Sequence, residues 1–195
     1  MQVESSSTPN PERRAQMRAK LIAAARALFV EKGFAEASTP DIVKRAGVTR
    51  GALYHHFADK EALFRAVVEA EALAVRDAID AIVPASQAED ALSLGSRAFF
   101  AAMAVEGRTR LLLVDGPAVL GIEAMDRIDA GGARAALRAG LAEAQPDWSA
   151  AELNALSVLL SAAFDRAAMA AKDQSDEERD LYQRVLEDLI LKALR

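Results

Sequence analysis

With 195 residues, of which 52% are hydrophobic and 5% aromatic, the chain has enough apolar side chains for a sizeable core and is not expected to be intrinsically disordered. It contains no cysteine, and its two histidines are the neighbours His55 and His56, which excludes disulfides, thiol nucleophiles and a helical zinc site. The net charge of −5 argues against nucleic-acid binding over the whole chain. Because most of the hydrophobic share is Ala and Leu, we expect an all-α protein without a metal or other cofactor.

The start of the chain is polar, which is typical of a flexible tail over residues 1–10 and not of a secretory signal or a membrane anchor. The most apolar stretch, residues 153–171, is interrupted by Asp165 and Arg166 and is expected to be too polar to span a bilayer. These features predict a soluble, cytoplasmic protein with no membrane partner.

Helix-start and helix-stop signals place three helices within residues 11–59. The segment Asn10 to Glu12 begins the first helix, and Gly33 ends it. Thr39 is expected to cap a short second helix that ends at Gly47, and Thr49 to cap a short third one. Two short helices joined by a glycine turn are typical of a helix-turn-helix, whose second helix usually enters the major groove of DNA.

The rest of the chain reads as a helical body. Asp59 precedes a helix over residues 60–83, and Ser-x-x-Glu capping boxes begin at Ser86, Ser149 and Ser175. Gly116-Pro117 and Gly131-Gly132 are expected to interrupt the body helices. We predict these further helices at about residues 87–105, 108–114, 118–129, 133–144, 150–172 and 176–194. The chain would then hold nine or ten helices, with a head over 11–59 and a body over 60–195.

The side chains of the third helix divide into a set expected to be buried and a set expected to be exposed. Leu53 and Phe57 share one face and are expected to pack in the core. Arg50 has the length and the forked donors that suit a guanine edge or a phosphate. The small residues Gly51 and Ala52 would let the helix backbone approach DNA. Phosphate oxygens are suitable partners for Tyr54, His55, His56 and Lys60, and for the helix N-termini at Thr39 and Thr49.

The net charge differs between the two parts of the chain in the way that a DNA-binding head requires. Residues 1–60 carry a net charge of +4, and residues 61–195 carry −9. A basic head on an acidic body is expected if only the head meets phosphate. Plainer interpretations remain open: the histidines as surface residues, Arg50 as a solvated charge, and Thr39 and Thr49 as helix caps alone.

The segment Ser38 to Phe64, STPDIVKRAGVTRGALYHHFADKEALF, resembles the signature of the TetR family of transcriptional regulators. Phe29 and Gly33-Phe34 agree with it as well, so the likeness covers roughly residues 13–64. The resemblance implies a homodimer whose first three helices bind double-stranded operator DNA. It also implies that the body binds a small-molecule inducer and that its last two long helices form the dimer. The positions that usually touch operator DNA are matched by Thr39, Thr49, Arg50, Gly51, Tyr54, His55, His56 and Lys60.

Several body residues together offer apolar surface and a few polar groups, which is the mixture found in ligand sites. The candidate ligand-binding set is Arg97, Phe100, Met103, Asp115, Phe164, Asp165 and Met169. The same residues also fit an ordinary core, and the charged ones also fit salt bridges.

The favoured function is a repressor that binds a palindromic operator and is released by an inducer of unknown identity. The first alternative is a ligand-independent or protein-controlled DNA-binding regulator. The second is a small helical enzyme, for which the sequence offers no cysteine and no cluster of His, Asp and Glu.

Overall fold

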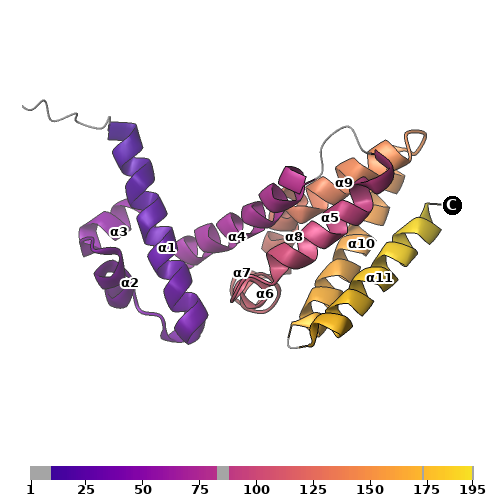
Figure 1. Cartoon of the computed structure of the whole chain (residues 1–195). Coiled ribbons are helices and arrows are strands. Elements are labelled where there is room, and N and C mark those ends of the chain that lie inside the picture. Colours follow the sequence, from indigo (N-terminus) through magenta and orange to yellow (C-terminus); the bar gives the residue numbers. More distant parts are fainter. Residues whose placement is uncertain (1–9, 83–87, 173, 195) are drawn as a thin grey trace, which may run out of the picture. The chain divides into compact units, whose positions relative to one another are not determined.

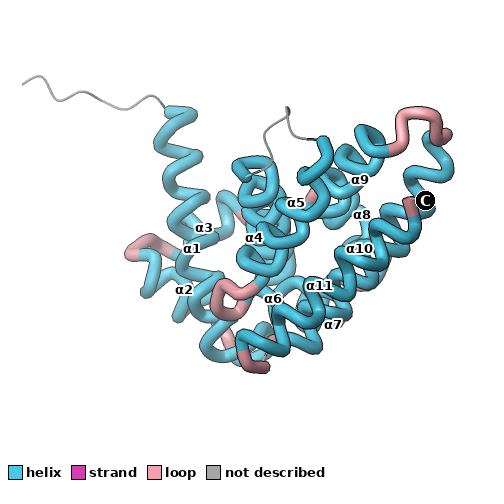
Figure 2. The backbone as a smooth tube through the Cα atoms, turned by 45° about the vertical axis from the view of Figure 1, so that its right-hand side comes forward, coloured by secondary structure: helices cyan, strands magenta, loops and turns pink. Residues whose placement is uncertain are grey.

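The structure, a computed structural model, describes residues 10–82, 88–172 and 174–194, and every regular element in these ranges is a helix (Figure 1, Figure 2). This confirms the all-α prediction. The elements are α1 (Asn10–Glu36), α2 (Thr39–Ala46), α3 (Arg50–His56), α4 (Lys60–Ile82), α5 (Ala88–Met103), α6 (Arg108–Arg110), the π-helix η1 (Leu111–Asp115), α7 (Gly116–Leu120), α8 (Ile122–Gly131), α9 (Ala133–Ala144), α10 (Ala150–Ala171) and α11 (Asp176–Ala193).

The chain divides into two compact units, Met1–Val67 and Val68–Arg195, so the division falls inside α4. The domain boundary predicted at residues 59 and 60 stays a prediction. The predicted tail and the capping box at Ser86 lie outside the described residues.

In the first unit, α1 packs against α2, and α2 packs against α3. The rings of Phe29, Phe34 and Phe64 form a cluster with centroids 5.0 to 5.9 Å apart, which joins α1 to the first turns of α4. Ile42 of α2 and Leu53 of α3 are fully buried. These contacts fix α3 on a short, well-packed core.

Side-chain caps mark the starts of several helices. Thr49 accepts a hydrogen bond from the Ala52 amide at 3.2 Å, and Asp59 accepts one from Ala62 at 2.7 Å, as predicted. Complete capping boxes are present at Ser149 and Ser175, which confirms both predicted starts.

Two predicted boundaries of the first unit differ from the structure. Ser38, and not Thr39, caps α2, because Ser38 has the extended backbone and accepts from the Asp41 amide at 3.2 Å. Gly33, with φ 79° and ψ 168°, interrupts α1 where the first helix was predicted to end, and the only difference is a further helical turn that follows to Glu36.

In the second unit, α9 contacts α5, α8 and α10, while α11 lies against α10 and α5 (Figure 1). The side chains that fill the space between these helices are apolar. They include Val75, Phe99, Leu111, Leu141, Leu160, Phe164 and Ile190, each buried.

The predicted break at Gly116-Pro117 is wrong, because the chain stays helical from Arg108 to Leu120. In a π-helix each amide donates to the carbonyl five residues earlier, one residue further than in an α-helix. The Gly116 amide accordingly donates to the Leu111 carbonyl. Pro117 follows at a helix start, where its missing N–H costs little. A Cβ on Gly116 would lie 2.8 Å from the Leu111 oxygen and 2.9 Å from the sulfur of Met125, so glycine serves close packing here. The break comes later, at Gly121 with φ 81°.

By length and composition alone, α10 is apolar enough to cross a membrane, contrary to what Asp165 and Arg166 led us to expect. Eight of its residues are buried, and it packs against α9 and α11. This is the position of a core helix in the second unit.

Candidate functional site

The exposed face of α3 carries most of the predicted DNA contacts. Thr49, Arg50, Gly51, Tyr54 and His55 are exposed, and Ala52 and His56 are half-buried, while the apolar side of the helix faces the core. The outward direction inferred from helical periodicity therefore agrees with the structure. Their contacts with DNA stay predictions.

Arg50, Tyr54 and Thr39 form a small constellation across α2 and α3. The guanidinium carbon of Arg50 lies 5.5 Å from the centre of the Tyr54 ring, within range of a cation–π contact. A hydrogen bond from Thr39, and then one from Arg50, hold the pKa of Tyr54 below its usual value. Groups of both helices therefore interact with the phenol, which stays accessible to a partner.

The two histidines differ in their surroundings. Desolvation lowers the pKa of His56, and the charges of His55, Arg14 and Arg18 lower it further. These effects favour the neutral imidazole, which can still donate one hydrogen bond. The ring of His55, 5.4 Å away, is more exposed.

Lys60 is held by the end of α1. Its ammonium donates to the carbonyls of Phe34 at 2.8 Å and Ala35 at 3.3 Å, and it lies 4.4 Å from the centre of the Phe34 ring. Two of its three N–H groups are thus engaged within the chain. The predicted phosphate contact competes with a structural role that the sequence did not indicate.

Gly51 has no structural reason to be glycine. Its backbone is helical, and the nearest atom to a Cβ built there is the Thr49 hydroxyl at 3.9 Å. A side chain would project into open space in the free protein. The small size of this residue is therefore compatible with a surface that a partner approaches closely.

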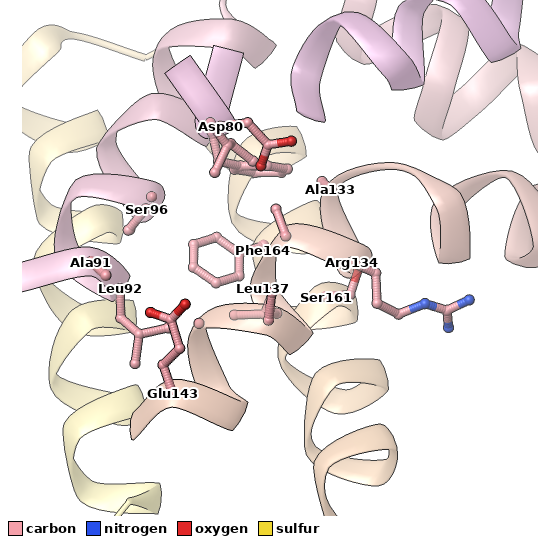
Figure 3. A pocket seen from close by; sticks show the side chains of 16 residues that line it. Asp80, Ala91, Leu92, Ser96, Ala133, Arg134, Leu137, Glu143, Ser161 and Phe164 are labelled. Atoms are coloured by element: carbon pink, nitrogen blue, oxygen red, sulfur yellow. The ribbon is translucent and has the colours of Figure 1, made fainter. Parts of the chain in front are cut away.

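Three cavities of the second unit are lined by predicted ligand residues. The Ser96 cavity, about 290 Å³, is lined by α4, α5, α9 and α10 and includes Phe164 (Figure 3). The Asp165 cavity, about 380 Å³, includes Met103, Asp165 and Met169. A third, about 300 Å³, includes Phe100 and Met103. Five of the seven predicted ligand residues thus line a cavity, although not the same one.

The other two, Arg97 and Asp115, line none of these cavities. Arg97 is exposed and pairs with Glu187 of α11 at 3.8 Å. Asp115 pairs with Arg110 at 3.1 Å. Both charges have a partner from the chain itself, which was the alternative that the sequence left open.

Sequence reasoning missed Arg134 of α9, which is buried in the wall shared by the Ser96 and Asp165 cavities. It pairs with Asp126 at 2.8 Å and Asp129 at 3.3 Å, and Ser161 donates to Asp129 at 2.9 Å. Desolvation raises the pKa of Asp165 to about 7, and the nearby charge of Asp129 contributes to this rise. No short-range sequence pattern marks this network, because its members come from three helices.

Asp165 is expected to make stability depend on pH. Its folded pKa of about 7 lies above the unfolded value, so the folded state binds more protons between about pH 4 and pH 7. The free energy of unfolding therefore falls as pH rises through this window. In the Asp165→Asn variant this fall should be smaller than in the wild type by about 1–3 kcal/mol. Urea unfolding at pH 5 and pH 8 measures it. The exposed Asp147→Asn is the control, and an unchanged pH dependence in Asp165→Asn would contradict the assignment.

The sequence and the fold both have known relatives. Residues 21–67 match the family described as bacterial regulatory proteins, tetR family. The probable HTH-type transcriptional regulator ArpR of Pseudomonas putida is 38% identical over 77 residues, which are 40% of this chain and 35% of ArpR. The chain therefore matches about a third of the length of this curated relative.

Solved structures match over nearly the whole chain. A TetR-family transcriptional regulator from Pectobacterium atrosepticum is 30% identical, with a TM-score of 0.71 over 96% of this chain and 97% of that one. RolR, described in complex with the ligand resorcinol, shares the fold at 21% identity, with a TM-score of 0.64 over 92% of this chain and 90% of RolR. The chain belongs to the TetR family of DNA-binding transcriptional regulators.

Proposed function

We propose that this protein is a cytoplasmic repressor that binds a palindromic operator as a homodimer and leaves it when a small molecule occupies the body. The observation that carries the DNA-binding part is the exposed face of α3. It combines a forked cation, Arg50, with the phenol of Tyr54 beside it, and with Gly51, whose backbone is open to a partner.

A second copy of the chain is the proposed partner of α10 and α11. Apolar side chains remain exposed on both helices although they pack against each other. On α10 these are Val158, Leu159 and Met169, and on α11 they are Leu181, Tyr182, Val185, Leu189 and Leu191. Leu186 and Ile190, also on α11, are buried in their own unit. A two-fold dimer would set the recognition helices one DNA turn apart, about 34–36 Å.

The body cavities support release by a small molecule. α4 begins at Lys60 and contributes Ala72, Val75 and Ile79 to the cavity walls, so a ligand there contacts a helix that continues into the first unit. RolR, which has the same fold, is described with resorcinol bound. A ligand shifts the protein away from the DNA-binding state only by the difference in its affinity for the two states.

The assignment of Arg50 is tested by selecting bound DNA from random sequence with the wild type and with Arg50→Ala. We expect Arg50→Ala to cost about 1–3 kcal/mol of operator binding and to relax base choice at one position in each half-site. Arg138→Ala, an exposed arginine of α9, is the matched control and should leave both unchanged. An equal loss on all sequences would identify Arg50 as a phosphate contact instead. If no sequence is enriched by the wild type, operator recognition itself is overturned.

A further inference from the structure

The Ser96 cavity has walls of apolar side chains from four helices. α5 contributes Leu92 and Phe99, α9 contributes Leu137, and α10 contributes Phe164, whose ring faces the cavity (Figure 3). The rings of Phe99 and Phe164 lie 5.2 Å apart and are both buried. Its volume of about 290 Å³ is about twice that of the roughly 150 Å³ cavity known to hold benzene. A molecule of one or two rings therefore fits in the Ser96 cavity.

Inside this apolar wall lies a hydroxyl without a partner. Ser96 is 2% exposed, and its Oγ has no hydrogen bond within the described part of the chain. A serine in a helix usually bonds the carbonyl one turn back, and a buried polar group left unsatisfied is costly. Ser96 belongs to the cavity wall while its Oγ is itself covered, so a turn of the side chain about χ1 would bring the hydroxyl to a molecule inside the cavity.

The charges around the cavity disfavour an anion. The guanidinium of Arg134 extends away from the space, toward Asp126 and Asp129 (Figure 3). The carboxylates are those of Asp80, which pairs with Arg76 at 3.3 Å, and of Glu143, and both residues are exposed. An anionic ligand would meet these carboxylates without a cation directed at it, whereas a neutral ligand gains the apolar walls without a charge to desolvate.

We propose that the Ser96 cavity binds an uncharged, largely apolar molecule of one or two rings that carries one hydroxyl or carbonyl group, and that Ser96 hydrogen-bonds this group. The role of this molecule as inducer rests on the proposed function. The binding of this molecule to the cavity is independent of the proposed function.

Calorimetric titration of the full chain with 2-naphthol, naphthalene and 2-naphthoate tests the chemistry. We expect 2-naphthol to bind roughly two- to tenfold more tightly than naphthalene, the range of one neutral hydrogen bond, and 2-naphthoate to bind more weakly than both. Ser96→Ala should remove the advantage of 2-naphthol over naphthalene, and Ser93→Ala, on the same helix but outside the cavity wall, should keep it. Tight binding of 2-naphthoate, or an unchanged ratio in Ser96→Ala, overturns the proposal.

Two further measurements keep the result interpretable. Ala136→Leu, which fills the cavity from α9, should weaken all three probes together, and unchanged binding would place the probes elsewhere. The thermal midpoint of ligand-free Ser96→Ala should equal or exceed that of the wild type, because the hydroxyl has no partner among the described residues to lose. A marked fall would show a structural serine and overturn its role as a ligand contact.

Release of selected DNA by 2-naphthol is measured separately. A protein that binds 2-naphthol as expected but keeps its DNA supports the cavity assignment and contradicts the inducer model. A protein that binds DNA but none of the probes overturns the cavity assignment and leaves DNA recognition standing.

Discussion

A protein that carries Val185→Glu together with Leu189→Glu is expected to be monomeric and to bind operator DNA weakly. Both residues lie on α11 and are 58% and 47% exposed in the single chain, so the charges do not enter its core. In the proposed dimer the same side chains would be desolvated. A buried charge without a partner costs several kcal/mol, and two-fold symmetry would place four of them in one interface.

Sedimentation and a DNA titration at the same protein concentration measure this effect. The control is Leu73→Glu together with Val114→Glu, which changes two exposed apolar residues of α4 and η1 and should leave the dimer intact. Circular dichroism should show the helical content of the wild type in both variants. A fully dimeric Val185→Glu/Leu189→Glu protein would place the interface on another surface.

Arg108→Leu is expected to lower the free energy of unfolding by about 3–5 kcal/mol, the largest effect on stability that we predict. Arg108 donates to Glu71 at 2.9 Å and to the Ala102 carbonyl at 2.8 Å, and the two ionic residues are 9% and 6% exposed. The substitution would leave the Glu71 carboxylate buried without this guanidinium. Loss of one member of a buried pair costs more than the pair contributes, because the remaining charge is desolvated.

Urea unfolding measures the loss, and two variants define its cause. Lys192→Ala breaks an exposed pair with Asp188, in which both side chains are 70% exposed, and should cost less than about 1 kcal/mol. Arg108→Leu combined with Glu71→Leu removes both charges and should recover much of the stability. If Arg108→Leu unfolds like the wild type, the pair is not desolvated as the structure indicates.

Local sequence patterns predicted most of the helix boundaries correctly. The caps at Thr49, Asp59, Ser149 and Ser175 depend on hydrogen bonds that span three residues, so the sequence contains all that they require. The two short helices around Gly47 were predictable for the same reason. At Ser38 and Thr39 two hydroxyl residues are adjacent, and only the backbone conformation decides which one is the cap. Gly116-Pro117 looked like a break because the π-helix before it has no sequence signature that we recognised.

The cavities were decided by tertiary structure. Helical periodicity predicts that Phe164 and Phe100 are apolar positions, but it does not say which neighbouring helix covers each of them, and the structure places them in different cavities. Arg97 looked like a ligand residue because a charge on an apolar helix suggests a buried role. It is exposed, whereas its neighbour Ser96 is buried, since successive residues of a helix are about 100° apart. Which of the two faces the interior depends on where α9 and α10 pack, and those contacts join residues far apart in the chain.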